Sequence, residues 1–484
     1  MARFSKLRRL ASDWRNHPNT RNKAGGQAHT LPPERELISM VTTNLVADRC
    51  YASADDDLAE LERIVKRLAD RGTLDFAAKA AIYARTEHGL RSITHALAGL
   101  VAHYASGSIW GRRFFDRIVF RVDDLCEILA FYWMRFGADA PVPNAMKRGF
   151  ATALQRFDAY QLAKYKGGQR AVSLVDVVNL CHPKSNAALD ALMKGTLAPA
   201  DTWEHALSNA GKQDGNTSEA KAEVWARLLA ERKLGYFAAL RNARNIAEQP
   251  PDSVAPLCAL LTDRRMVRNS LVLPFQIAKG IDAIGKTQQP GLRRLVEALH
   301  TALDISLGNV PHLPGRTLIA LDTSGSMMGQ PIDIASLFAA VLLKSQDEAD
   351  LLTFSTEAEY QHLSTRGSAY DIAERIKQRI RYAGTNFHSI FQTARGAYER
   401  IVILSDMQAW IGHHTPAESF RKYCHRTHCD PMVYTWDLAH YGTAQFPADK
   451  VCALAGWTDK VFGIMETVER DPDAMVTAVK AIEL

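Results

Sequence analysis

The chain contains no hydrophobic run long enough to cross a membrane, and it is poor in cysteine. Its longest clean apolar stretch, residues 334–343, is far shorter than the roughly 18 residues that a membrane-spanning helix needs. Seven scattered cysteines do not make a disulfide framework and favour a reducing compartment. The basic N-terminus lacks the apolar segment of a secretory signal. We therefore expect a cytoplasmic protein without a membrane partner.

The chain also lacks a strong excess of charge, because its formal net charge is only +6. This small value hides an uneven distribution. Residues 1–310 hold 43 Lys and Arg against 32 Asp and Glu, a net +11, whereas residues 311–484 hold 16 against 21, a net −5. Polyanions are bound through repeated basic side chains, so a polyanion is expected to bind the N-terminal part.

The two parts differ in hydrophobic pattern as well. Up to residue 310 the apolar residues repeat with helical spacing, as at 58–68, and no period-2 strand stands out. Leu154, Phe157 and Leu162 indicate a helix that ends before Gly167, and Ser173 is a predicted N-cap of the next helix. Many helices with short connections predict an α-solenoid with degenerate repeats.

After the break at 310–315, β-rich runs alternate with helical patterns. This alternation predicts a mostly parallel, doubly wound sheet, so the fold class is mainly α plus α/β. We expect a basic arm at 1–20, a helical module at 21–310 and an α/β domain at 311–484. The predicted strands are Thr317–Leu321, Asp350–Phe354, Ile401–Leu404, Met432–Trp436 and Val461–Ile464.

Oxygen-bearing side chains follow three predicted elements of the α/β domain. Asp322, Ser324 and Ser326 directly follow its first strand, and Thr385 and Asp406 are expected at equivalent strand ends. Ligands of doubly wound sheets bind at the carboxyl ends of the strands. Carboxylate and hydroxyl oxygens suit Mg²⁺, which keeps several of its waters. The sequence therefore predicts a Mg²⁺ site.

These five residues resemble the metal-ion-dependent adhesion site of von Willebrand factor A domains, whose pattern is D-x-S-x-S, then Thr, then Asp. The resemblance implies that Asp322, Ser324 and Ser326 bind the ion, Thr385 binds it directly or through water, and Asp406 binds it through water. The usual Gly-Gly before the Thr is Ala383-Gly384 here.

Other chemistry is less well supported by the residues of this domain. Ser324 and Ser326 lack a G-x-S-x-G elbow, and two carboxylates provide only a sparse site for a metal-dependent hydrolase. The segment Cys424-His-Arg-Thr-His-Cys429 places its candidate ligands within six residues, without the separated pairs of a structural zinc site.

Basic clusters recur along the helical module. Arg113, Arg117 and Arg121 are spaced by four and predict a stripe along one helix face, and Lys147-Arg148 forms a second cluster. Any one cluster is typical of a solvated helix face, but several in one net-positive module favour a polyanion. Composition does not choose between RNA, DNA and an acidic protein.

Several segments resemble the TROVE module of the Ro 60 kDa autoantigen family, in which this module precedes a von Willebrand A domain. The resemblance spans roughly residues 20–484 and rests on scattered motifs in the family's order. The segments are Asn22-Lys-Ala-Gly-Gly26, Asn144-Ala-Met-Lys-Arg148, Leu162-Ala-Lys-Tyr-Lys166, Val175–Leu180, Cys181-His-Pro-Lys184 and Leu240-Arg-Asn242.

The resemblance implies a ring of HEAT-like helical repeats, closed by packing between the N-terminal region and the A domain. It implies that single-stranded RNA 3′ ends enter the central hole and that Y-like RNA binds the outer basic surface.

The family's RNA contacts carry over to three positions. Lys164 and His182 match directly, while Arg170 needs a one-residue shift because Gly167-Gly168 lengthens the loop. The cations would neutralise phosphates and the imidazole would stack on or hydrogen-bond a base. Alternatively, His182 is a helix C-terminal histidine that satisfies carbonyls. Arg91 and His95, spaced i and i+4, are further candidates for the hole. Candidates for the outer surface are Arg113, Arg117, Arg121, Lys147 and Arg148.

The sequence thus predicts a monomeric, non-enzymatic Ro-type ring protein that binds Y-like RNA and the 3′ ends of misfolded RNA in RNA quality control. Bacterial relatives work with exoribonucleases, so an exoribonuclease is an expected protein partner. The alternative is a protein-interaction scaffold that binds an acidic partner through Mg²⁺ at the A domain.

Overall fold

The computed structural model describes most of the chain. The described residues are 19–22, 24–43, 54–166, 171–198, 203, 206–207, 218–248, 254–270, 272, 274–285, 290–310, 312–380, 383–409, 411, 416–438, 443–446, 451–455, 465 and 474–484. Among the helices that the structure describes, none combines the length and the apolar character needed to cross a lipid bilayer.

The chain forms two compact units, and each unit contains one end of the chain. Unit 1 comprises Met1–Leu31 and Leu207–Pro472, and unit 2 comprises Pro32–Ala206 and Asp473–Leu484. The change from helices to α/β structure falls near residue 310, as the sequence indicates, but this position lies inside unit 1. The compact units thus have other bounds than the expected modules, whose limits stay a prediction.

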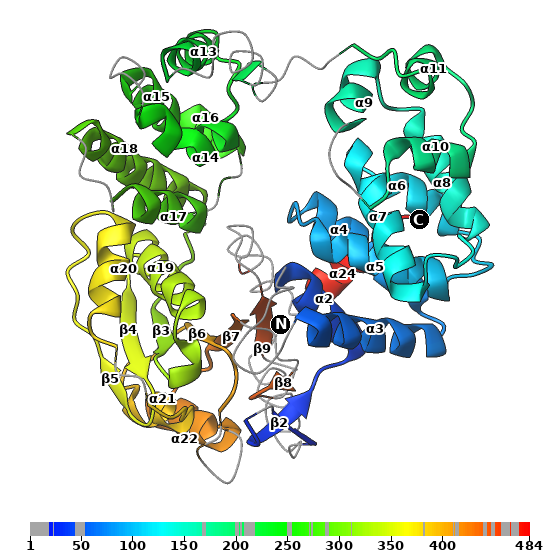
Figure 1. The fold of residues 1–484 in the computed structure, drawn as a ribbon. Coiled ribbons are helices and arrows are strands. Elements are labelled where there is room, and N and C mark those ends of the chain that lie inside the picture. Colours follow the sequence, from blue (N-terminus) through cyan, green and yellow to red (C-terminus); the bar gives the residue numbers. More distant parts are fainter. Residues whose placement is uncertain are drawn as a thin grey trace. The chain divides into compact units, whose positions relative to one another are not determined.

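The described residues of unit 2 form helices and their connections, without a strand. The predicted helix at 58–68 is confirmed, because Leu61, Ile64, Val65 and Leu68 of α3 are all fully buried. C-terminal helix α24 packs on α2 and α4 of the same unit (Figure 1). The helices are α2 (Pro33–Thr43), α3 (Ala54–Asp70), α4 (Leu74–Thr86), α5 (Ser92–Tyr104), α6 (Gly111–Arg117), α7 (Val122–Phe136), α8 (Asn144–Leu154), α9 (Ala159–Lys166), α10 (Leu174–Cys181), α11 (Ala187–Met193) and α24 (Ala474–Lys480).

Local sequence signals explain where two of these helices begin and end. Ser173 caps α10, as predicted, because its side chain accepts the backbone N–H of Asp176 while Asp176 bonds back. The single helix expected across Leu154 and Leu162 is wrong, since α8 ends at Leu154 and α9 begins at Ala159. Asp158 accepts the Gln161 N–H at 2.7 Å and so starts a new helix within the apolar pattern.

In its longer segment, Leu207–Pro472, unit 1 has a helical half followed by the α/β part. The helices before the sheet are α13 (Ser218–Ala230), α14 (Tyr236–Ala247), α15 (Val254–Leu261), α16 (Arg264–Ser270), α17 (Pro274–Gly285) and α18 (Pro290–Ser306), and a short turn, η2 (Leu307–Asn309), follows them. Long helix α18 packs against α15, α16 and α17, which gives this half its own apolar core.

The α/β part is a doubly wound sheet in the order β5-β4-β3-β6-β7-β9, parallel except for β5 at the edge (Figure 1). Alternate strand residues face opposite sides. Leu318 and Ile401 pack with α21 and α22, whereas Trp436 contacts Phe338 of α19. The strands are β3 (Thr317–Asp322), β4 (Ala349–Phe354), β5 (Ala358–Tyr360), β6 (Arg400–Ser405), β7 (Met432–Asp437) and β9 (Val451–Ala455), and the helices are α19 (Gln330–Ser345), α20 (Ala369–Lys377), α21 (His388–Thr393) and α22 (Ala417–Thr427).

The predicted mainly α plus α/β class is confirmed, as are four of the five predicted strands. The fifth, Val461–Ile464, lies outside the described residues. Strand β9 was not predicted, because its Val-Cys-Ala-Leu-Ala sequence has little of the β-branched and aromatic character that marks strands.

A small second sheet in unit 1 joins the N-terminal segment to the α/β part. It consists of β1 (Thr20–Arg21), β2 (Gln27–Thr30) and β8 (Thr443–Ala444), and β2 pairs antiparallel with β8. This pairing confirms that N-terminal residues pack on the α/β part, as the resemblance implies. Closure into a ring stays a prediction.

Candidate metal centre and nucleic-acid contact residues

The structure brings the predicted oxygen ligands together at the carboxyl edge of the sheet. Asp322 ends β3, Asp406 follows β6, and neither is exposed. Ser324 forms a bridge with Ala383, which places the Thr385 segment beside the β3 loop. Because β3 and β6 are neighbouring parallel strands, their ends meet at this edge.

Hydrogen bonds fix most of the oxygen atoms in this cluster. Oδ1 of Asp322 accepts the Ser324 backbone N–H at 2.8 Å, and Oδ2 accepts the hydroxyl of Ser405. The hydroxyls of Ser324 and Ser326 lie 3.3 Å apart. Oδ1 of Asp406 accepts the Gln408 N–H at 3.1 Å, while its buried Oδ2 has no hydrogen-bond partner among the described residues. One carboxylate oxygen is therefore buried and available.

The two buried carboxylates of this cluster affect each other's ionisation. Burial, and after it the nearby charge of Asp406, raises the pKa of Asp322, and burial also raises the pKa of Asp406. Two buried carboxylates disfavour each other's ionised form unless a cation compensates them. The buried Asp406 oxygen and the hydroxyls of Ser324, Ser326 and Thr385 are hard-oxygen donors that fit Mg²⁺.

The cysteine and histidine segment at 424–429 has a different geometry. It covers the end of α22 and the turn after it, where His428 adopts left-handed backbone angles. The Cys429 thiol lies 3.0 Å from the Thr427 hydroxyl. Within the described ranges, no group of three or more His, Cys, Asp or Glu side chains is placed to hold a metal ion.

The N-terminal hairpin docks next to the oxygen cluster through residues that sequence reasoning did not identify. Asn22 donates its amide to the Ala409 carbonyl at 2.6 Å and accepts the Gly26 N–H at 2.8 Å. Gln408 accepts the Ala24 N–H at 3.3 Å and donates to the carbonyl of Asp406 at 3.3 Å. Gln408 thus links the Asn22–Gly26 segment to Asp406, one of the predicted metal ligands.

Two of the three expected RNA contacts are exposed in unit 2. Lys164 lies on α9 with its ammonium 5.8 Å from the Tyr165 ring centre. His182 ends α10 with φ 46°, and its backbone N–H, not its ring, bonds to the Val178 carbonyl. The ring is exposed and makes no hydrogen bond within the described part of the chain. Arg170 lies outside the described residues.

The arginines expected to form one stripe do not share a helix. Arg113 and Arg117 lie on α6, which ends at Arg117, whereas Arg121 immediately precedes α7. Arg113 donates to the carbonyl of Leu484 at 3.1 Å and Arg117 to that of Glu483. The prediction of a continuous helical stripe is therefore wrong, because helix α6 ends at Arg117. Two of the three arginines instead bond to the carbonyls of Glu483 and Leu484.

Arg91 and His95 belong to a cluster of ion pairs between α5 and α7. Arg91, directly before α5, contacts Asp123 at 2.6 Å, and His95 contacts Asp124 at 2.8 Å. Burial alone would raise the pKa of Asp124, but His95 and Arg85 together lower it below its usual value. His95 is only 7% exposed, so these two candidates have a structural role that their spacing did not reveal.

Lys147 and Arg148 lie on α8, with Arg148 exposed and Lys147 half-buried. Lys147 acts electrostatically on Cys181, which adjoins His182 in the chain. The structure thus places a further cation near the end of α10.

Comparisons with known proteins agree with this architecture. The sequence pattern of the TROVE domain matches residues 48–197 and 187–302. The RNA-binding protein RO60 of Deinococcus radiodurans is 25% identical over 486 residues, which cover 87% of this chain and 89% of the relative. Telomerase protein component 1 of Rattus norvegicus is 27% identical over 164 residues, or 33% of this chain and 6% of that protein.

The crystal structure of the Deinococcus radiodurans RO (RSR) protein matches with a TM-score of 0.62 at 18% identity. The match covers 93% of this chain and 99% of that chain, so the two proteins share a fold along nearly their full lengths.

Proposed function

Because the TROVE domain pattern covers more than half of its residues, the chain belongs to the TROVE domain family, and we propose that it is an RNA-binding protein. The observation that carries this proposal is the match across residues 48–302, together with similarity to a protein named for RNA binding over 87% of the chain. The relative that matches over 87% of the chain is named for RNA binding and not for a catalysed reaction, which supports a non-enzymatic role.

We further propose that the ligands are small noncoding, Y-like RNAs and the single-stranded 3′ ends of misfolded RNA. In this role the protein would act in RNA quality control in the cytoplasm as a monomeric ring, with an exoribonuclease as its protein partner. The support is the resemblance of its motifs and the content of scattered cysteines.

The proposed contact surface includes the ends of α9 and α10. Lys164 would neutralise a phosphate, and the exposed His182 ring would stack on or hydrogen-bond a base. Arg170 and the cations Lys147 and Arg148 would extend the contact. Since phosphate neutralisation releases counterions, affinity should fall steeply with salt.

The test is binding of an RNA with a single-stranded 3′ tail to wild type and to Lys164→Ala/His182→Ala. We expect about a tenfold weaker Kd and a salt slope lower by about 0.7, the value for one lost phosphate contact in a single strand. Lys194→Ala, an exposed lysine in the same unit, is the matched control. Unchanged binding by the double variant would show that these residues are not the contact.

We also propose that Asp322, Ser324, Ser326, Thr385 and Asp406 hold Mg²⁺. The buried Asp406 oxygen without a partner among the described residues favours this proposal. Bound Mg²⁺ would supply an open coordination position for an anionic oxygen. The same site supports a second candidate function, a scaffold that binds the carboxylate of an acidic protein partner.

One measurement separates these candidates. Nucleic acid that co-purifies with the protein, seen in the 260/280 nm absorbance ratio before and after a high-salt wash, favours the RNA-binding proposal. Nucleic-acid-free protein that binds acidic peptides only with Mg²⁺ favours the scaffold. RNA cleavage that requires Mg²⁺ and is abolished by Asp322→Ala would contradict the non-enzymatic role.

A further inference from the structure

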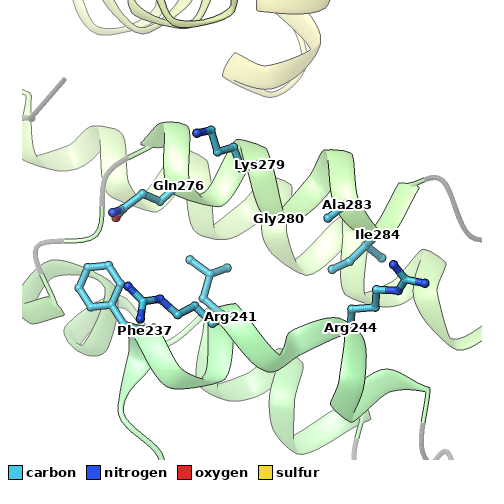
Figure 2. A pocket seen from close by; sticks show the side chains of 9 residues that line it. Phe237, Arg241, Arg244, Gln276, Lys279, Gly280, Ala283 and Ile284 are labelled. Atoms are coloured by element: carbon cyan, nitrogen blue, oxygen red, sulfur yellow. The ribbon is translucent and has the colours of Figure 1, made fainter. Parts of the chain in front are cut away.

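A basic groove lies between α14 and α17 in the helical half of unit 1 (Figure 2). Its volume is about 300 Å³, which suits a part of an extended strand rather than a folded partner. Three of its lining residues are cations and none is acidic. The lining residues are Phe237, Leu240, Arg241, Arg244, Gln276, Lys279, Gly280, Ala283 and Ile284.

Small and aliphatic residues line part of the groove. Gly280 has no side chain, and a Cβ at this position would lie 3.3 Å from Cδ1 of Leu240. Ala283 is the next small residue along the same wall of α17. Gly280 and Ala283 thus add little side-chain bulk to the part of α17 that lines the groove.

The charged wall is formed by two arginines of α14. Arg241 is exposed and has no carboxylate within ion-pair distance in the described part of the chain. Arg244 contacts Glu248 at 2.8 Å, but 55% of its side chain stays exposed. Residues three apart on a helix lie about 5–6 Å apart, so the pair can meet two neighbouring phosphates of one strand.

One end of the groove offers a surface for a base. The ring of Phe237 is half-buried beside Arg241, and Gln276 of α17 lies across from it (Figure 2). Aromatic rings bind unpaired bases by stacking whatever the base, and an amide can meet a base edge. The lining residues of the groove include cations next to an aromatic ring and no acidic side chain. This combination is typical of a site for single-stranded nucleic acid.

We infer that the groove between α14 and α17 binds single-stranded RNA, with phosphates on Arg241 and Arg244 and a base on Phe237. This inference rests on the proposed RNA-binding function, but the site lies in unit 1, whereas Lys164 and His182 belong to unit 2. The groove would therefore hold a second stretch of the same kind of ligand.

The test measures fluorescence anisotropy of a labelled oligouridine with wild type and Arg241→Gln/Arg244→Gln across a salt series. We expect a Kd about tenfold weaker and a salt slope lower by about 1.4, or about 0.7 for each lost phosphate contact. Arg264→Gln/Arg265→Gln is the matched control, because it removes the same charge from exposed positions of α16 outside the groove. Phe237→Leu should weaken binding about fivefold or more without changing the salt slope.

The outcomes separate this inference from the function on which it rests. If wild type binds RNA and Lys164→Ala/His182→Ala weakens it, but the groove variants match the α16 control, the groove assignment is wrong and the proposed function stands. If wild type does not bind RNA at any salt concentration, both fail. A photo-crosslink from a 4-thiouridine oligonucleotide to the peptide that contains Phe237, lost in Arg241→Gln/Arg244→Gln, would support the groove directly.

Discussion

Replacing Asn22 with alanine should release the N-terminal hairpin from the loop after Asp406. The substitution removes the only side chain that the structure shows bonding both to Ala409 and to Gly26. The Ala409 carbonyl is buried and would lose its donor, at a cost of about 1–3 kcal/mol. The bond to Gly26 adds about 0.5–1.5 kcal/mol. A total of about 1.5–4.5 kcal/mol should raise local opening roughly 10- to 1,600-fold.

Hydrogen exchange followed by mass spectrometry measures this opening, because amides of β2 are protected through pairing with β8. We expect residues 27–30 to exchange faster in Asn22→Ala while the strands of the large sheet stay protected. Asn19→Ala is the control, since it also removes two bonds, but both join Asn19 to Thr30 within the exposed hairpin. One of them holds the Thr30 N–H itself, so the two variants are compared at residues 27–29. Equal exchange of these residues in the two variants would refute the reasoning.

Three other predictions concern the remaining contacts. Mg²⁺ at about 100 times its Kd should stabilise the protein by about 2.7 kcal/mol, which calorimetry measures as a higher Tm. Asp322→Asn should abolish this response. The same substitution should stabilise the metal-free protein, because burial opposes the charged form of the Asp322 carboxyl group. Because the pKa of Asp124 is lowered in the folded protein, its ion pairs contribute fully to the free energy of unfolding above the unfolded-state pKa of about 3.9. This contribution is lost as the pH falls below that value, which urea unfolding at several pH values should show in wild type and not in Asp124→Asn. At pH 7 the variant should be about 3–5 kcal/mol less stable than wild type. Val479→Ala, at a fully buried position of α24, should cost about 2 kcal/mol, whereas the exposed Thr477→Ala should change the unfolding free energy little.

The clustering of the candidate oxygen ligands could be predicted because the fold constrains their positions strongly. Alternating apolar strands and helices imply a parallel sheet, and the ends of such strands meet at one edge. Asp322 and Asp406 directly follow runs that are recognisable as strands, so their proximity followed from position alone. Strand β9 was not predicted from the sequence, because its residues have a low strand propensity.

The basic residues could not be assigned in the same way, because their partners are distant in sequence. The four-residue spacing of Arg113 and Arg117 indicates one helix face, but no local pattern reveals that they bond to Glu483 and Leu484. Arg91 likewise looks like a free cation until Asp123 is seen beside it. Whether a cation is available for RNA is decided by tertiary contacts.

Each of the two units is built from two separate segments of the chain, so the units are joined by three covalent connections. The chain passes from unit 1 to unit 2 after Leu31, returns after Ala206 and crosses again after Pro472. A single proteolytic cut at any one crossing leaves two covalent links, so neither unit is freed by it. Expression of residues 1–310 alone would leave β2 without β8 and α4 without α24. A dissected fragment that keeps each unit whole therefore needs a rearranged chain order, not a simple truncation.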